Sequence, residues 1–224
     1  MIYARDSESY NALKSIKDDK KIKLCPDFTV LFNGIKPEYF DDAKHQVCIV
    51  PNQRMKDKTS DAQNYEEFFA VIIKKIQAKN LVPFFLIFGG EEDKKLAEKI
   101  NNLLETKIEI IDEENPYYIK GIIENSVALI GSRFHSLASG LYSGIPTLGT
   151  GWSHKYKHLF KLFDFEDGLI ELNLANEKID EKLEWIFDEA KRKILKNKLN
   201  DKKKYLIELS NNLFNEIKNL IREK

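Results

Sequence analysis

From about residue 46 onwards, short β-rich runs alternate with segments of helical spacing, and this alternation constrains the fold more than any other feature. Several runs are apolar at successive positions, as strands covered on both faces require. The expected strands are residues 45–51, 81–88, 107–111, 126–130 and 146–148, with a weaker one at 168–172. Strands that alternate with helices favour a parallel sheet with crossover helices.

The segments between the runs place their apolar residues on one helical face. We expect helices at residues 65–78, 93–105, 116–125 and 135–143. Pro116 suits the first turn of its helix, and Gly144 follows the last one as a C-cap glycine would. The sequence therefore predicts an α/β fold, a doubly wound parallel Rossmann-like sheet, with one complete domain at residues 45–173.

The two ends of the chain differ from this domain. Residues 1–44 hold one helix (7–16), a short strand (21–24) and the turn Cys25-Pro26-Asp27, which is too little for a domain. We interpret them as the remnant of a preceding α/β domain followed by a linker. Residues 174–224 are typical of charged amphipathic helices that pack on the domain. Their Lys-rich stretch at 191–204 is flanked by Asp and Glu, which favours a solvated helical face.

Composition limits the partners and the compartment. The 224 residues carry 36 basic and 36 acidic side chains, so the basic excess of a nucleic-acid-binding protein is missing. No apolar run reaches the ~18–20 residues of a membrane span, and the first residues lack the pattern of a signal peptide. Cys25 and Cys48 stand far apart, which favours reduced thiols. We expect a cytoplasmic protein that can work at the inner face of the membrane.

Four loops should share the carboxyl edge of the sheet, where ligands bind in such folds: residues 51–58, 88–93, 131–136 and 149–155. In the third loop, Arg133, His135 and Ser136 fall in or near the first turn of a helix. An arginine there is disfavoured unless an anion is nearby, and a guanidinium clamps phosphate or carboxylate well. His135 can donate to the same anion or move a proton. The alternative is an Arg133 paired with a carboxylate beside a half-buried capping His135.

Downstream, Lys155 should point into the same cleft, and Trp152 can form the floor for a sugar ring. The alternative for this loop is Ser153 as a helix cap with solvated lysines. At the front, Arg5 stands at the start of the helix at 7–16, again beside a positive helix end. A carboxylate that holds Arg5 structurally explains it equally well.

Other familiar site patterns are weak. His154 and His158 are four residues apart, but nothing nearby completes a ligand set, so no metal is expected. Gly89-Gly90 and the acidic residues 91–93 fit a tight turn and an acidic helix start. The chain has no G-x-G-x-x-G, Walker A, G-x-S-x-G or H-E-x-x-H motif, so no cofactor is expected.

Taken together, six ordered motifs resemble the polysaccharide pyruvyl transferase family. They are Arg5-Asp6-x-x-Ser9, Pro26-Asp27, Val50-Pro51-Asn52, Ile130-Gly-Ser-Arg133-Phe-His135-Ser136, Gly144-Ile-Pro146 and Trp152-Ser153-x-Lys155. The likeness covers about residues 3–165, and the helical tail contributes nothing to it. Trp152 stands where the family usually has Tyr.

The resemblance implies a GT-B-like architecture, in which two Rossmann-like domains face each other across a cleft. This sequence matches the second domain and the end of the first. It also implies transfer of pyruvate from phosphoenolpyruvate to a sugar hydroxyl of a cell-surface polysaccharide, or of a lipid-linked saccharide, as a ketal.

Carried over by motif, the resemblance makes Arg133 and His135 the phosphoenolpyruvate-binding pair, with His135 also able to move a proton. Lys155 becomes a second anion contact, and Arg5 faces them from the other lobe. Ser136, Trp152 and Ser153 complete the expected substrate contacts.

Two other functions stay open at this level. A nucleotide-sugar-dependent glycosyltransferase on the same fold would also place a cation at a helix start, where it can hold a diphosphate. A non-catalytic carbohydrate- or partner-binding remnant is the other, because half of the cleft is missing from the match. A further lobe or a homo-oligomer would have to supply that half.

Overall fold

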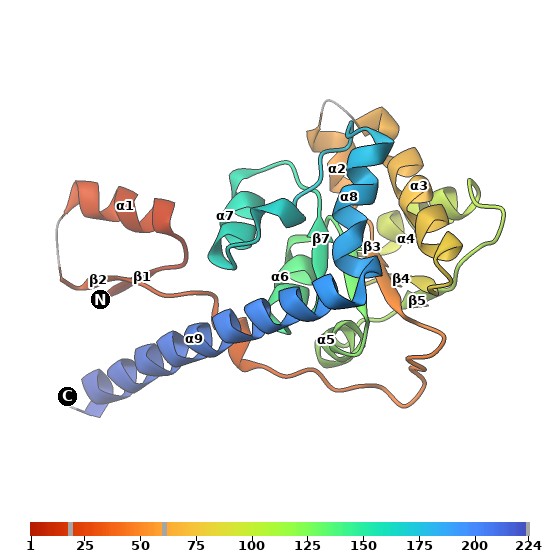
Figure 1. Cartoon of the computed structure of the whole chain (residues 1–224). Coiled ribbons are helices and arrows are strands. Elements are labelled where there is room, and N and C mark those ends of the chain that lie inside the picture. Colours follow the sequence, from red (N-terminus) through yellow and green to blue (C-terminus); the bar gives the residue numbers. More distant parts are fainter. Residues whose placement is uncertain (18–19, 60–61, 223–224) are drawn as a thin grey trace.

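The computed structural model describes residues 1–17, 20–59 and 62–222. Its centre is a parallel sheet that has five strands within these residues, in the order β5-β4-β3-β6-β7 (Figure 1). Because β3 is the first strand of the domain along the chain, this is the doubly wound Rossmann order. The predicted fold class is confirmed. The strands are β3 (Val47–Val50), β4 (Pro83–Ile87), β5 (Ile110–Asp112), β6 (Ala128–Gly131) and β7 (Thr147–Gly149).

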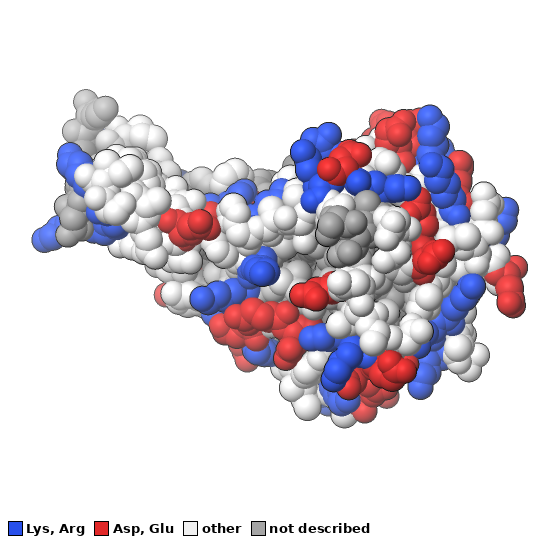
Figure 2. All heavy atoms as spheres, turned by 90° about the horizontal axis from the view of Figure 1, so that it is seen from above, with Lys and Arg blue, Asp and Glu red and all other residues white. Residues whose placement is uncertain are grey.

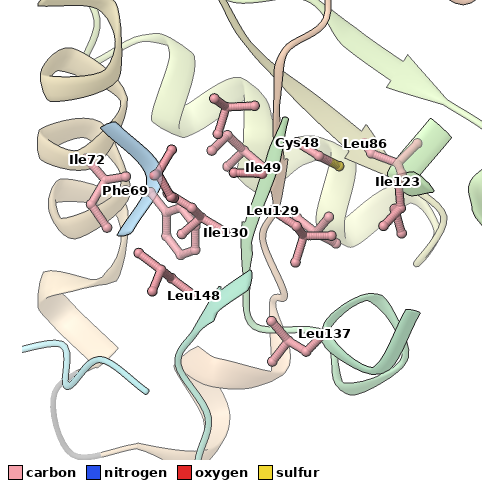
Figure 3. Close-up of a cluster of buried hydrophobic side chains, with 14 of the residues drawn as sticks. Cys48, Ile49, Phe69, Ile72, Leu86, Ile123, Leu129, Ile130, Leu137 and Leu148 are labelled. Atoms are coloured by element: carbon pink, nitrogen blue, oxygen red, sulfur yellow. The ribbon is translucent and has the colours of Figure 1, made fainter. Parts of the chain in front are cut away.

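Helices cover both faces of the sheet. The helices α3 (Tyr65–Ala78) and α4 (Glu91–Asn101) lie side by side, as do α5 (Pro116–Glu124) and α6 (Phe134–Tyr142). Figure 3 shows Phe69 and Ile72 of α3 approaching one face, while Ile123 of α5 and Leu137 of α6 approach the other. All residues of β3, β4 and β6 are buried, which explains why these runs are continuously apolar rather than alternating.

The chain begins with a small β-α-β unit. We define the N-terminal unit as β1 (Ile2–Ala4), α1 (Ser7–Ile16) and β2 (Ile22–Leu24), in which the two strands pair in parallel. A short 3-10 helix, η1 (Phe28–Leu31), leads on to the domain. The helix α1 buries none of its residues, so this unit has almost no core of its own.

Two C-terminal helices, α8 (Asn176–Phe187) and α9 (Glu189–Arg222), complete the described chain. The helix α8 lies against α3, where Lys75 pairs with Asp180 at 2.7 Å. The long α9 packs on α6 and η1 and then reaches the N-terminal unit (Figure 1). There the Tyr3 hydroxyl donates to Glu216 at 2.6 Å, and Lys23 pairs with the same carboxylate.

Several elements differ from the sequence prediction. Residues 168–172 form no strand, because the 3-10 helix η3 (Glu166–Gly168) takes up their start and only Gly149 and Leu169 form a single parallel bridge. The three-residue β1 was not predicted. The expected loop at 51–58 contains α2 (Arg54–Lys58), and η2 (Ala62–Asn64) precedes α3. Ser153 does precede a helix, α7 (His154–Leu162).

Charge is spread evenly over the visible surface. On the face that Figure 2 shows, Lys and Arg side chains alternate with Asp and Glu, and no continuous basic surface forms. Within the described ranges, no helix combines the length and the apolar character that crossing a membrane requires.

Candidate functional site

The loop after β6 lies at the point where the strand order reverses, between β6 and its neighbour β3. Three side chains fix its position at Ser132. Asn52, which follows β3, donates from Nδ2 to the Ser132 carbonyl at 3.1 Å. The Tyr156 hydroxyl donates to the same carbonyl at 3.1 Å, and Tyr65 shares a short hydrogen bond with the Ser132 hydroxyl. The loop is therefore held rigidly at the edge where ligands bind in this fold.

The two tyrosines that hold this loop are buried, and burial raises the pKa of both the Tyr65 and the Tyr156 phenol. For Tyr156 the nearby Arg133 opposes this effect only in part. Both phenols consequently stay protonated at neutral pH. The Tyr156 hydroxyl donates, whereas the Tyr65 hydroxyl also accepts from the backbone N–H of Asn52 at 2.8 Å.

Arg133 lies beside a buried carboxylate. Its Nε donates to Oδ2 of Asp93, and its Nη2 donates to the Gly89 carbonyl at 3.3 Å. The Asp93 side chain is only 2% exposed, and its Oδ1 also accepts a hydrogen bond from the backbone N–H of Gln53 at 3.0 Å. The guanidinium lies so close to Gly89 that a Cβ at that position would collide with it. Arg133 is therefore paired with a carboxylate, as the alternative interpretation of its motif expected. Its Nη1 has no partner among the described residues.

A first cavity of about 280 Å³ lies where the N-terminal unit meets α6, α7 and α9. Arg5 and Lys155 enter it from different elements and approach the same aromatic ring. The Arg5 guanidinium carbon lies 5.7 Å from the centre of the Phe134 ring, and Lys155 Nζ lies 4.9 Å from it. The structure therefore brings these two predicted site residues together across Phe134.

The charges in this first cavity are unevenly paired. Arg5 Nη1 lies 3.5 Å from Oδ2 of Asp27, and His158 Nδ1 lies 3.8 Å from Oδ1 of Asp6. Burial acts to raise the pKa of Asp6, but hydrogen bonds from Ser9 and the nearby cations outweigh it and lower that pKa. Lys155, by contrast, has no carboxylate partner within the described residues. Its ammonium contacts only aromatic rings, including Trp152 at 5.7 Å, and is available to an anion.

A second cavity of about 460 Å³ adjoins the first and is lined by His135. Asp27, Ala138 and Tyr142 line both cavities. His135 is exposed, and its ring makes no hydrogen bond to any described residue. Because Phe134 and His135 are consecutive, the first turn of α6 presents one residue to each cavity.

The other predicted contacts take structural places. The Ser136 hydroxyl donates to the Arg133 carbonyl at 2.7 Å and is buried. Ser153 begins α7 without a side-chain capping bond, and its buried Oγ has no partner among the described residues. Trp152 packs on Tyr156 with 5.3 Å between ring centres and lines neither cavity. His154 and His158 face Glu8, but no described group of three or more side chains is arranged to hold a metal.

Sequence reasoning missed Asp93, Phe134 and Tyr142 as parts of this region. For Asp93 a signal existed, since the loop at 88–93 was placed at the same edge as the loop that carries Arg133. For Phe134 and Tyr142 only the helical spacing of α6 would have shown that they lie on the side that faces the N-terminal unit.

The fold of the chain is shared with GT-B glycosyltransferases and with related sugar-nucleotide enzymes. Among solved structures, 76 chains match this protein. A structure from Listeria monocytogenes described as a UDP-N-acetylglucosamine 2-epimerase aligns with a TM-score of 0.65 and 11% identity, over 99% of this chain and 60% of that one. TarM from S. aureus, in complex with UDP, aligns with a TM-score of 0.58 and 17% identity, over 95% of this chain and 43% of that one. WaaG, a glycosyltransferase involved in lipopolysaccharide biosynthesis, aligns with a TM-score of 0.55 and 11% identity, over 94% of this chain and 60% of that one.

These similarities, with the Rossmann strand order, define the class: one lobe of a GT-B-like α/β protein. The chain spans about half the length of the solved structures that it resembles. Comparison with curated proteins gives no match. The sequence pattern of the polysaccharide pyruvyl transferases matches residues 1–154, and the chain belongs to this family. The family predicted from the ordered motifs is confirmed.

Proposed function

We propose that the protein takes part in the transfer of pyruvate from phosphoenolpyruvate to a hydroxyl of a saccharide, with formation of a ketal. One observation carries the proposal beyond family membership. Arg5 and Lys155 approach one ring from the N-terminal unit and from α7, and the next residue after that ring is His135. Cations that converge beside a titratable side chain suit a dianionic donor and an acid–base step.

The first cavity suits phosphoenolpyruvate, which carries a phosphate and a carboxylate. Lys155 offers an ammonium that no described carboxylate neutralises, and Lys161 also lines this cavity. Arg5 is 54% exposed and only loosely paired with Asp27, so its fork can turn to a bound anion. Arg133 lines neither cavity, so the donor contact that the resemblance implies for it stays a prediction.

The reaction can be written so that atoms balance. A proton adds to C3 of phosphoenolpyruvate, and a sugar hydroxyl oxygen forms a bond to C2 as its own proton leaves. The bond from C2 to the phosphate oxygen then breaks, inorganic phosphate departs, and a second hydroxyl adds to C2 with loss of its proton. In this proposal, His135 accepts a hydroxyl proton or returns it at C3.

A direct test is incubation of the protein, as the homo-oligomer or together with the further lobe that completes the cleft, with phosphoenolpyruvate and a set of oligosaccharides. Phosphate release and product mass are then measured. We expect phosphate release only when a saccharide is present, and a product whose mass has gained a pyruvyl ketal. Phosphate release without any modified saccharide would contradict the proposal.

A nucleotide-sugar-dependent glycosyl transfer is the second candidate. It is favoured by the GT-B-like fold, since the S. aureus TarM structure that aligns with this chain was solved with UDP. A cavity with convergent cations would also hold a diphosphate. Competition between UDP and phosphoenolpyruvate separates the two candidates. If neither ligand binds, a non-catalytic carbohydrate- or partner-binding role gains support. The cytoplasmic location, the inner membrane face and a homo-oligomer or further lobe stay predictions.

A further inference from the structure

The second cavity has an aromatic lining that is unusually open to solvent. Tyr117, at the start of α5, is 48% exposed, and Phe32, after η1, is 49% exposed. Phe88, at the end of β4, adds a third ring to the lining. Two large rings that stay half-exposed inside a concave surface contribute little to folding and are suited to contact a ligand.

Polar groups without protein partners stand beside these rings. The side chains of Asn33, His135 and Ser139 line the cavity and make no hydrogen bond to any described residue. Among them they supply both donors and acceptors. Hydroxyl groups, which also donate and accept, are the natural complement of such a set.

The charges of the second cavity disfavour an anion. Its ammonium, Lys120, donates to the carbonyls of Thr29 and Phe32, at 3.0 Å for Thr29, and so is already used. Burial lowers the pKa of Lys120, and the nearby Glu124 carboxylate opposes this effect in part. The carboxylate of Asp27 lies on the wall shared with the first cavity. A neutral, hydroxyl-rich ligand is therefore favoured over a phosphate here.

We propose that the second cavity binds the saccharide acceptor, with a sugar ring stacked on Tyr117 and Phe32 and its hydroxyls bonded to Asn33, Ser139 and His135. The C–H groups on one face of a sugar ring are attracted to the electron-rich face of an aromatic ring. This inference rests on the proposed function, because it assigns the acceptor of that reaction to a place beside the donor cavity. The first turn of α6 then separates the donor, at Phe134, from the acceptor, at His135.

The test is saturation-transfer NMR with methyl glycosides of neutral hexoses and of N-acetylhexosamines, without phosphoenolpyruvate. We expect saturation of the C–H protons on one face of the bound sugar. Tyr117→Ala and Phe32→Ala should each weaken binding about 3- to 10-fold, while Tyr117→Phe retains it. Tyr39→Ala removes another exposed aromatic ring, outside both cavities, and should leave binding unchanged.

Three results would overturn the inference. The first two are no saccharide binding, and binding that Tyr117→Ala and Phe32→Ala leave intact. The third is a long-chain alkyl glycoside that binds no more tightly than the corresponding alkyl alcohol. This result would show that the cavity binds an alkyl chain and not a sugar. We expect phosphoenolpyruvate binding, measured on separate aliquots of the same preparations, to be unaffected by these variants. Its loss would count against the proposed function and not against the saccharide site.

Discussion

For Arg133, the sequence motif and the structure indicate different partners. The motif implies a donor-binding arginine, whereas the structure shows its guanidinium neutralising Asp93, whose side chain is 2% exposed. Removing one partner of a buried ion pair leaves the other charge uncompensated. We therefore expect Arg133→Met to lower the free energy of unfolding by about 3–5 kcal/mol, measured by urea denaturation.

The matched control is the double variant that carries both Arg133→Met and Asp93→Asn, because it removes both charges of the ion pair. It should recover a large part of the lost stability. If the single variant is as stable as the wild type, the ion pair does not stabilise the fold, and a role in ligand binding alone remains for Arg133.

His135 has a different expected signature, because it is exposed and makes no hydrogen bond within the described residues. If it moves the acceptor proton, His135→Gln should lower turnover about 10²–10⁴-fold and leave phosphoenolpyruvate affinity nearly unchanged. Steady-state kinetics and donor binding on the same preparation separate the two effects. Equal losses in binding and turnover would make His135 an anion contact instead.

Sequence reasoning placed Arg133, His135 and Lys155 at one edge of the sheet, because the strand–loop–helix order decides that edge. It could not assign Lys155 to the first cavity and His135 to the second, or show that Arg133 lines neither. That difference depends on side-chain direction in the first turn of α6 and on the buried Asp93, which its two acidic neighbours, Glu91 and Glu92, make look like part of an acidic helix start.

At the level of elements, the contact between α9 and the N-terminal unit is an electrostatic one. Hydrogen bonds from Lys23 and then from Tyr3 lower the pKa of Glu216. A carboxyl with a lowered folded-state pKa stabilises the folded contact above its unfolded pKa of about 4.3 and loses this as pH falls through the folded value. We expect the amides of residues 2–4 and 22–24 to lose hydrogen-exchange protection below about pH 4, after correction for intrinsic rates.

The amides of β3 and β4, buried in the domain, are the internal control and should stay protected over the same range. Glu216→Gln should reproduce the low-pH behaviour at neutral pH. If the protection of these wild-type amides is the same above and below about pH 4, the contact does not depend on the charge of Glu216.

The same scale shows why most elements were predictable and a few were not. The buried strands of the domain carry four or five successive apolar residues, a signal that no neighbour can override. The run at 168–172 has only two successive apolar residues, and the 3-10 helix at 166–168 leaves it a single bridge to β7. The strand β1 has three residues and pairs only with β2, so local pattern alone could not reveal it.

At the scale of the whole molecule, the balanced charge of the chain hides a local asymmetry. The first cavity gathers Arg5, Lys155, His158, Lys161 and Lys202 around its walls, against Asp6 and Asp27. The second cavity is aromatic, and its ammonium is already bonded. This separation of a cationic cavity from an aromatic one is what a transferase with an anionic donor and a neutral acceptor requires.

Calorimetric titration of phosphoenolpyruvate into the chain tests the central claim most directly. Lys155→Gln removes a cation of the first cavity that lies over the Phe134 ring and lacks a described carboxylate partner, and Lys157→Gln, at an exposed position of α7, is its matched control. We predict that Lys155→Gln weakens binding roughly 10- to 100-fold, the effect of losing one charged hydrogen bond, while Lys157→Gln binds as the wild type does. Equal affinity in all three proteins, or binding of UDP in place of phosphoenolpyruvate, would contradict the account.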